Sequence, residues 1–297
     1  MIEINNQLIK QVLGIETDEE IHCESLGLII DHEKQNILSF LDDQTFVADL
    51  NSSHNVSAIF VSKKLSSKVT SANIKKIICD DPRYSFYTLL NYLNKQNYKE
   101  RDTQIHPTAK VDSSASVATH NVEIGENVII EPNAVIFPDV VIGNNSIVRA
   151  GAILGSQGFE HKRTTKGILS VFHDGQVIIG ENVTIGANNI IDKGFSDRNT
   201  KVGNFTKCNS FVFIGHRAQI GKRCLIGVGA IITGSSTVED DVWIGPSATI
   251  SNQVKVGRGA RVTMGSVVTQ SVKSGAHVTG NFAIDHGRFI NFIKSIR

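Results

Sequence analysis

The chain has almost no net charge: among its 297 residues, 30 Lys and Arg stand against 29 Asp and Glu. A protein without a strong field of one sign does not collect nucleic acid or anionic membrane surfaces nonspecifically. We therefore expect no nucleic-acid partner. Cysteine is also scarce, and its four copies form no CxxC motif, which favours reduced thiols, a cytoplasmic location and no metal centre built on cysteine. They are Cys23, Cys79, Cys208 and Cys224.

Long hydrophobic runs are missing as well. No apolar stretch reaches about 18 residues, the length that a helix needs to cross a bilayer. The first residues, MIEINNQLIKQVLGIE, are polar and acidic and lack the basic start and apolar centre of a secretory signal. The sequence predicts neither membrane spanning nor secretion.

A six-residue repeat dominates the second half of the chain. An aliphatic or small apolar residue recurs at every sixth position, and a small or β-branched residue follows each of these by four. The first set is Val202, Cys208, Ile214, Ile220, Ile226, Ile232, Val238, Ile244, Ile250, Val256, Val262 and Val268. The second set is Thr206, Val212, Ala218, Cys224, Ala230, Ser236, Val242, Ala248, Val254, Ala260, Ser266 and Val272. A period of six fits neither a helix nor an ordinary strand and is the signature of a hexapeptide β-helix.

This repeat predicts the fold. Each hexad makes one short strand and a corner, three hexads close a triangular coil, and the first residue of each hexad points inward. The same register appears earlier, so we expect a left-handed parallel β-helix over residues 103–280 of a mainly β chain. The earlier inner positions are Ile105, Val111, Val117, Ile124, Ile130, Ile136, Ile142, Val148 and Leu154.

Two breaks interrupt the repeat. The register is lost after Leu154 and resumes at Ile179, which predicts a loop over 155–178 that leaves the coil, and KGFSDRNTK forms a shorter break. Long loops in a solenoid cost little chain entropy and often carry function. A surface insertion that is merely tolerated is the alternative.

The two ends of the chain lack the six-residue repeat. Residues 1–100 combine the strand-like segments LGLII, ILSFL, SAIFVS and KKIICD with a helical segment, PRYSFYTLLNYLNKQ, and predict a small α/β domain. Residues 283–297 place Phe289, Phe292, Ile293 and Ile296 on one helical face. We expect a short terminal helix that caps the open end of the solenoid.

Among the ten histidines, His216 is the candidate for chemistry. It occupies the third position of its hexad in NSFVFIGHRAQIG, so its ring should project outward near a corner. The flat faces of a β-helix bury a ligand poorly, whereas three copies around an axis create clefts between neighbours. We therefore expect a homotrimer with sites between subunits. By position alone, an outward histidine is more often solvated than catalytic.

Several segments together resemble the UDP-3-O-acylglucosamine N-acyltransferases of lipid A synthesis. These are IGHRAQIG, IGENVTIGANNIIDKG, LGSQGF and VVTQSV in the repeats, and ILSFLDDQTF, SAIFVS and DDPRYSFYTLL in the first domain. The resemblance covers most of the chain in one order. It implies a uridine-binding first domain and an acyltransferase β-helix.

The resemblance also implies roles for single residues. His216 falls on the catalytic base, and a histidine suits this role because an attacking amine must lose a proton near neutral pH. Phe40 and Phe46 align with aromatic residues that hold the uracil, although core packing is the alternative for each. By position alone, Gly215, or a glycine of a neighbouring coil, is a candidate donor to the oxyanion. In the ejected loop, the substrate-binding candidates are Gly158, Phe159 and His173, with His161 as a further histidine.

The chain departs from the family pattern at several positions. Asp43 replaces an asparagine of the nucleotide site, Asn209 replaces an aspartate seven positions before the base, and Gln253 replaces a second histidine. The terminal helical segment is also shorter than the family's extension for acyl carrier protein. We expect these departures to bear on nucleotide, donor and acceptor choice.

The sequence thus predicts an N-acyltransferase that moves an acyl group from a thioester to a nucleotide-linked amino sugar in lipopolysaccharide or surface-glycan synthesis. The donor is acyl carrier protein or coenzyme A as a co-substrate, with no tightly bound cofactor, and the acceptor carries UDP or dTDP. One alternative is an inactive nucleotide-sugar-binding scaffold. Another is a zinc hydratase of the carbonic anhydrase type, which needs three converging histidines, yet the position one hexad after His216 is Lys222.

Overall fold

The computed structural model describes residues 3–29, 34–196, 198–280 and 283–296. The chain divides into two compact units. Unit 1 contains Met1–Glu100, Phe159–Asp174 and Phe195–Asp197, and unit 2 contains Arg101–Gly158, Gly175–Gly194 and Arg198–Arg297. Each unit is described by itself.

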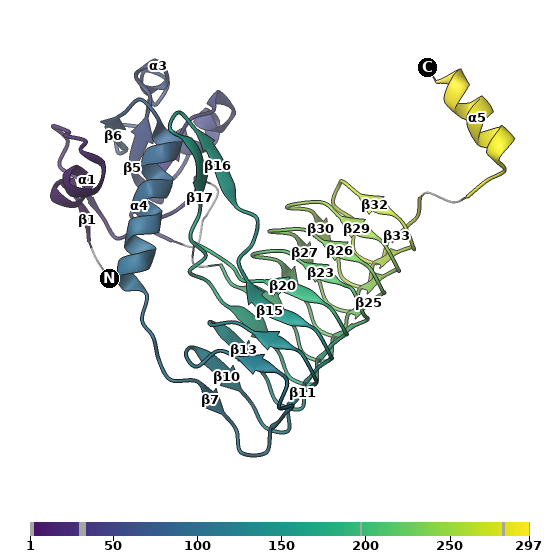
Figure 1. The fold of residues 1–297 in the computed structure, drawn as a ribbon. Helices are drawn as coiled ribbons and strands as arrows, with labels where there is room; N and C mark the ends of the chain where they lie inside the picture. The colour runs from purple at the N-terminus through teal and green to yellow at the C-terminus, as the bar shows by residue number, and fades with distance from the viewer. Residues whose placement is uncertain (1–2, 30–33, 197, 281–282, 297) are drawn as a thin grey trace. The chain divides into compact units, whose positions relative to one another are not determined.

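Unit 2 is the predicted left-handed parallel β-helix, whose short strands stack into three parallel sheets (Figure 1). We call these sheets faces 1, 2 and 3 in the order in which the chain visits them. Face 1 contains β7 (Gln104–Ile105), β10 (Val122–Ile124), β13 (Val140–Ile142), β18 (Val177–Ile179), β21 (Thr200–Val202), β24 (Gln219–Ile220), β27 (Thr237–Val238) and β30 (Lys255–Val256). Face 2 contains β8 (Lys110–Val111), β11 (Ile129–Ile130), β14 (Ile147–Val148), β19 (Thr184–Ile185), β22 (Lys207–Cys208), β25 (Leu225–Ile226), β28 (Trp243–Ile244), β31 (Arg261–Val262) and β33 (His277–Val278). Face 3 contains β9 (Ser116–Val117), β12 (Val135–Ile136), β15 (Ile153–Ser156), β20 (Ile190–Asp192), β23 (Phe213–Ile214), β26 (Ile231–Ile232), β29 (Thr249–Ile250) and β32 (Val267–Val268).

The predicted hexad register is confirmed along the repeat. Every inner position from Val202 to Val268, and every small position from Thr206 to Val272, is buried. The apolar side chains among them form one continuous core that extends back to Val122. Each coil therefore stabilises its neighbours by burying the same column of aliphatic groups.

The corners of the β-helix need a residue in the left-handed region of φ. Asparagine, which adopts this conformation readily, supplies it in the early coils, as at Asn127 and Asn182. At four consecutive corners around His216 the same position holds bulky residues, whose φ angles lie between 57° and 65°: Phe205, Phe211, Arg217 and Arg223. Such backbone costs about 1 kcal/mol per residue for a side chain that is neither Gly nor Asn. The corners around His216 therefore carry backbone strain at bulky residues.

Unit 1 is the predicted small α/β structure. Its central sheet is parallel and contains β3 (Ser25–Leu26), β4 (Ile37–Leu41), β5 (Val56–Val61) and β6 (Lys75–Ile78). A second, antiparallel pair contains β1 (Ile4–Asn5) and β2 (His22–Cys23). The helices are α1 (Asn6–Leu13), η1 (Gln44–Phe46), α2 (Val47–Asn51), α3 (Lys63–Ser66) and α4 (Pro82–Asn97). Asp81 caps the predicted helix α4 by accepting from the Tyr84 amide, and Pro82 occupies its first turn.

The predicted loop over 155–178 is largely an antiparallel hairpin that belongs to unit 1. Its strands are β16 (His161–Thr164) and β17 (Gly167–Ser170). The hairpin is fastened to α4 at both ends, because the Asp81 carboxylate accepts from the Thr165 amide at 2.6 Å and Asn91 accepts from the Phe172 amide at 2.7 Å. The six-residue period indicates only where the repeat stops and resumes, so it could not predict the hairpin between these points.

The terminal helix α5 (His286–Ser295) forms as expected, but its apolar face is not covered. Phe289, Phe292 and Ile296 are each about half exposed, so within one chain the helix does not cap the solenoid as we expected. No helix in the described part of the chain is long and apolar enough to cross a membrane. All four cysteines are free, and burial raises the pKa of Cys208 to about 12.

Candidate functional site

His216 lies where the chain turns from face 3 to face 1. We call the successive turns of this edge the His216 corner, which contains Asp139, Ser156, Asp192–Lys193, His216–Arg217, Gly234–Ser235 and Gln253. Register pairs Ile191 with Ile214, and Ile214 with Ile232, so Lys193, His216 and Gly234 stack in three consecutive coils. The regular repeat therefore brings charged and polar groups from separate coils to one edge.

The imidazole of His216 rests directly on Gly234 of the next coil. It is half-buried, and a Cβ added to Gly234 would lie 2.5 Å from both Cε1 and Nε2 of the ring. Only glycine leaves room for the ring in this position. Its neighbour Ser235 donates its amide to the His216 carbonyl at 2.8 Å, which fixes the two coils against each other.

The backbone amides at this corner are not equivalent. Gly215, which we considered as an oxyanion donor, already donates its N–H to the Ile232 carbonyl at 2.8 Å. By contrast, the N–H of Gly234 has no acceptor among the residues that the structure describes. A buried glycine amide without an acceptor, beside an imidazole, is the arrangement that stabilises a developing oxyanion. The glycine of the neighbouring coil is therefore the better candidate.

A buried ion pair lies on the other side of His216. The ammonium of Lys193 is 2.9 Å from the Asp139 carboxylate, and both side chains are less than a tenth exposed. Asp139 also accepts from the Asn121 amide group at 3.0 Å. The pair joins two coils across the point where the long loop leaves the β-helix, so it anchors the coil on which His216 stacks.

Replacing Lys193 by Met should lower the free energy of unfolding by about 3 kcal/mol, because it leaves the Asp139 charge buried without its cation. Urea denaturation followed by circular dichroism measures this loss. The double variant Lys193→Met with Asp139→Asn should recover most of it, and the exposed Lys201→Met serves as the control. A loss no larger than that of the control would contradict the assigned role of the pair.

Asp192 is a second buried acid of the corner. It is 6% exposed, and its carboxylate accepts from the Ser156 hydroxyl at 2.7 Å. Burial raises the pKa of the Asp192 carboxyl to about 6, and the hydrogen bond from Ser156 opposes this rise only in part. Lys193, its neighbour in sequence, is engaged with Asp139 instead.

At neutral pH the buried, ionised carboxylate of Asp192 lowers the free energy of unfolding, as its raised pKa indicates. Below about pH 4 the carboxyl is protonated in both states and costs nothing, whereas above about pH 6 the native state holds a charge that the unfolded state tolerates better. Asp192→Asn should therefore raise the free energy of unfolding by about 2 kcal/mol at pH 8, and the gain should vanish at pH 4. Urea titrations at both pH values measure it. A variant that is less stable at pH 8 would refute this assignment.

The other predicted β-helix residues fall on two corners. Gln253 lies at the His216 corner. Its side chain is exposed, and its backbone N–H donates to the Gly234 carbonyl at 3.3 Å. Asn209 lies at the turn from face 2 to face 3, where its side chain accepts from the Ser210 amide at 2.7 Å. Within one chain the structure therefore does not bring Asn209 to His216. Asn209 instead borders an open groove of about 510 Å³ on face 2 with Lys207, Leu225 and Trp243.

The predicted nucleotide residues lie together in unit 1. Phe40 is half-buried and packs on Phe86 and Tyr87, with ring centroids 4.9 and 5.6 Å away. Phe46 ends η1 and is 41% exposed, so it is the more accessible of the two aromatic candidates. Asp43 caps η1 by accepting from the Thr45 amide, and this hydrogen bond lowers the pKa of its carboxyl.

The loop candidates separate from one another. Gly158 is the last residue of unit 2 before the hairpin, and Phe159 is 85% exposed with its ring against that of His161. His173 is 1% exposed and packs edge-on against Phe195 inside unit 1. The burial of His173 makes it a core residue of unit 1, in contrast to the expectation that it contacts a ligand.

Within the described residues no group of three or more His, Cys, Asp or Glu side chains is placed to hold a metal ion.

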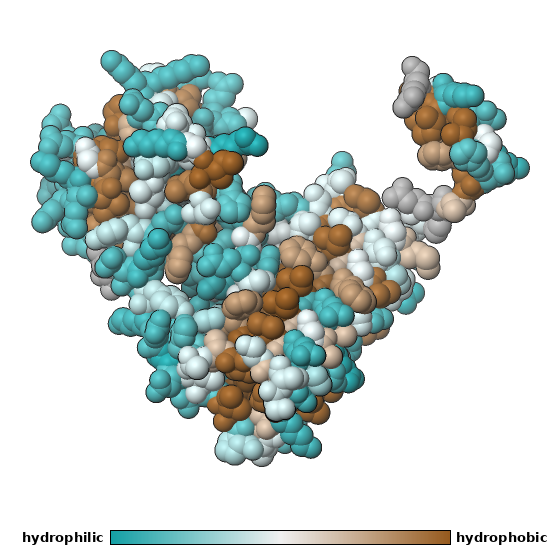
Figure 2. All heavy atoms as spheres, in the orientation of Figure 1, coloured by the Kyte–Doolittle hydropathy of each residue, from teal (hydrophilic) through white to brown (hydrophobic). Residues whose placement is uncertain are grey.

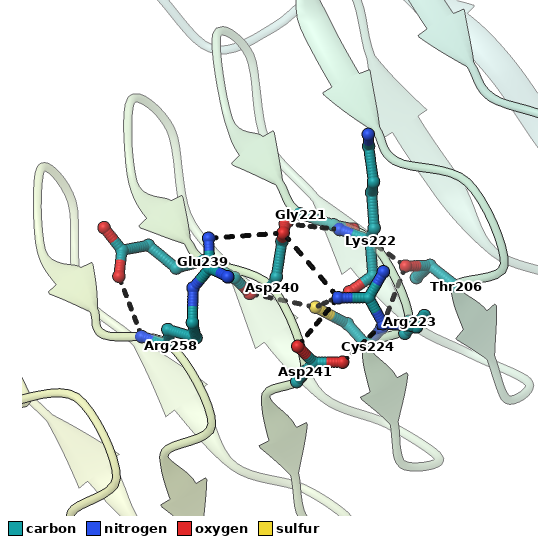
Figure 3. A network of polar contacts seen from close by, with 9 residues as sticks. All are labelled: Thr206, Gly221, Lys222, Arg223, Cys224, Glu239, Asp240, Asp241 and Arg258. Atoms are coloured by element: carbon teal, nitrogen blue, oxygen red, sulfur yellow. Dashed lines mark hydrogen bonds and ion pairs between the residues drawn. The ribbon is translucent and has the colours of Figure 1, made fainter.

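A network of charged residues lies at the turn from face 1 to face 2, where Arg223 binds Asp241 with two hydrogen bonds of 2.6 and 2.8 Å, and Asp240 accepts from the Lys222 amide (Figure 3). These contacts join consecutive coils, so we assign the network a structural role.

Asp192 and Lys193 were not predicted from the sequence, and Gly234 was predicted only as an unspecified glycine of a neighbouring coil. A signal for the first two was present, since two charged residues follow the inner position Ile191 immediately before a break in the repeat. Gly234 stands three hexads, or one full coil, after His216. Counting one coil forward from the candidate base would have identified it.

The family models match the repeats. A model described as bacterial transferase hexapeptide (six repeats) matches residues 121–156 and 235–270, and a hexapeptide repeat of succinyl-transferase matches residues 176–196 and 217–237. The fold and these matches define the class: the chain carries a left-handed β-helix built from hexapeptide repeats of the kind described for bacterial transferases.

Curated relatives narrow this class. The chain is 33% identical over 230 residues to the UDP-3-O-acylglucosamine N-acyltransferase of Coxiella burnetii, which covers 67% of this chain and 65% of the relative. It is 45% identical over 100 residues to the enzyme of the same name from Methylorubrum extorquens, covering 34% of this chain and 28% of the relative. The chain thus belongs to the hexapeptide-repeat family that includes the UDP-3-O-acylglucosamine N-acyltransferases.

The aligned part covers less than two thirds of each of these relatives. Among solved structures, a UDP-N-acetylglucosamine acyltransferase is 22% identical, with a TM-score of 0.49 over 65% of this chain and 79% of that chain.

Proposed function

We propose that the protein is an N-acyltransferase that moves an acyl group from a thioester to the amine of a nucleotide-linked amino sugar, with His216 as the general base. The observation that carries this proposal is the His216 imidazole lying on Gly234, whose N–H has no acceptor in the described part of the chain. A base and an oxyanion donor side by side are what acyl transfer requires. The names of the related proteins support the choice of acceptor.

The chemistry follows from this geometry. The amine nitrogen attacks the thioester carbonyl carbon, a C–N bond forms, and the carbonyl oxygen takes up the negative charge. The Gly234 N–H stabilises this oxyanion, and His216 accepts the proton that the nitrogen loses. The C–S bond then breaks as the carbonyl forms again, and the thiolate takes the proton from the imidazolium.

Unit 1 supplies nucleotide recognition in this proposal. Phe40 and Phe46 offer ring faces for the base, and Asp43, which lies between them in the sequence, caps η1. Uridine is the favoured nucleoside because of the related enzymes, with a dTDP sugar as the other option. The acyl donor is a carrier-protein or coenzyme A thioester, and four free thiols, three of them buried, support a reducing, cytoplasmic setting.

The assembly in the proposal is a homotrimer. Exposed apolar side chains follow one another along faces 2 and 3, and hydrophobic atoms form a band along the visible side of the β-helix (Figure 2). The residues on these faces include Ile129, Ile190, Leu225, Ile231 and Val267. Apolar side chains gathered on one exposed surface mark an interaction site, and a second and third copy of the same chain would cover it. Sedimentation equilibrium should give three times the mass of 32.4 kDa, and a monomer at micromolar concentration would contradict it.

A thioester-cleavage assay tests the proposed activity. The purified protein is incubated with acyl carrier protein or coenzyme A thioesters and a panel of UDP- and dTDP-amino sugars, and the released thiol and the amide product are measured. We expect amide formation with at least one amino sugar and no thiol release without one. Absence of product with every pair would contradict the proposal.

A further inference from the structure

Asp192 stands out among the titratable groups that the proposed mechanism does not use. It ends strand β20, and Ile191 before it pairs with Ile214. Neighbouring strands of a sheet lie about 4.8 Å apart, so Asp192 lies beside Gly215, the residue that precedes His216. The carboxylate and the imidazole therefore belong to adjacent coils of the same corner.

The position that Asp192 occupies is one where a glycine is common in this chain. A Cβ added to Gly186 would lie 2.3 Å from the Asn209 backbone, and one added to Gly215 would lie 2.7 Å from the Gly234 nitrogen. Glycine avoids such contact with the next coil. At the His216 corner, however, the equivalent position in the coil preceding His216 is Asp192, which carries a carboxylate.

The charge of Asp192 is only weakly compensated. Among the described residues its hydrogen-bond donor is the neutral Ser156 hydroxyl, while Lys193 pairs with Asp139 at 2.9 Å. A buried carboxylate without a cation is unfavourable, which agrees with the raised pKa of this group. A cationic group of a ligand would relieve this cost.

We propose that the Asp192 carboxylate recognises the acceptor amine at the His216 corner in its ammonium form and so selects amines over hydroxyls. The bound ammonium releases one proton to solvent before the neutral nitrogen attacks, and His216 takes the second proton. An ammonium offers three N–H donors and a full positive charge, whereas a hydroxyl offers one donor and no charge. Ser156 orients the carboxylate. The inference rests on the proposed function, because it takes the amine to be the reacting group at His216.

Calorimetric titration with UDP-glucosamine and UDP-glucose tests this inference, because these probes differ in one amine and one hydroxyl. The wild-type protein should bind UDP-glucosamine at least about 10-fold more tightly, as a hydrogen bond to a charged group typically allows. Asp192→Asn should bind UDP-glucosamine and UDP-glucose with equal affinity. Its affinity for UDP-glucose should equal that of the wild-type protein, which also shows that the variant is folded. Ser156→Ala keeps the carboxylate and should retain the preference for the amine.

Asp112→Asn is the matched control, because Asp112 is also hydrogen-bonded by a serine, Ser114, at 2.6 Å, but lies in the first coil away from the corner. Retention of the preference in Asp192→Asn would overturn the inference, as would equal affinities in the wild-type protein. Failure of the transfer assay with an intact amine preference would contradict the proposed function and leave this inference standing.

Discussion

Replacing His216 by Ala should lower kcat for acyl transfer by about 10³-fold, because the amine then loses its proton without a positioned base. Thiol release from the acyl donor measures the rate, and mass spectrometry identifies the amide. The side chain is half-buried and stands outside the aliphatic core, so the fold and the subunit assembly should be retained.

His54→Ala provides the control, since this histidine is exposed and lies in unit 1. It should keep wild-type turnover. Near-normal turnover of His216→Ala, with an unchanged circular dichroism spectrum, would remove His216 from the mechanism.

Replacing Gly234 by Ala should also cost about 10³-fold in kcat/KM. The added methyl group would lie 2.5 Å from two atoms of the His216 ring, so the ring must move away from its present position. Misplacing a catalytic group by about 1 Å, or losing one oxyanion donor, each costs on the order of 10²-fold or more. This variant retains the imidazole and so tests its position separately from its presence.

The matched control is Gly280→Ala, where an added Cβ meets no atom within 4 Å. It should have wild-type activity. A Gly234→Ala protein that is folded and fully active would show that neither the ring position nor the Gly234 amide matters for turnover.

The repeat could be predicted almost residue by residue because one physical rule applies to every coil. Each inner side chain from Val202 to Val268 must fit between similar apolar neighbours in the adjacent coils, so the pattern is visible without any structure. The location of His216 at a corner followed from the same rule. Its partner Gly234 follows as well, since it is one coil further along the chain.

Features outside the repeat followed no such rule. The hairpin of β16 and β17 is held by contacts with α4 that join residues more than 80 positions apart, such as Thr165 and Asp81. The Lys193–Asp139 pair similarly joins residues on either side of the long loop. Charged residues of this kind look like ordinary surface residues in a sequence, and only the register of the coils shows that they are buried.

A crystal structure of the protein with a bound UDP-amino sugar tests the central claim most directly. The account predicts that the sugar amine lies within hydrogen-bond distance of Nε2 of His216 and that a carboxylate oxygen of Asp192 faces the same nitrogen. A ligand bound with its amine remote from the His216 corner would contradict it.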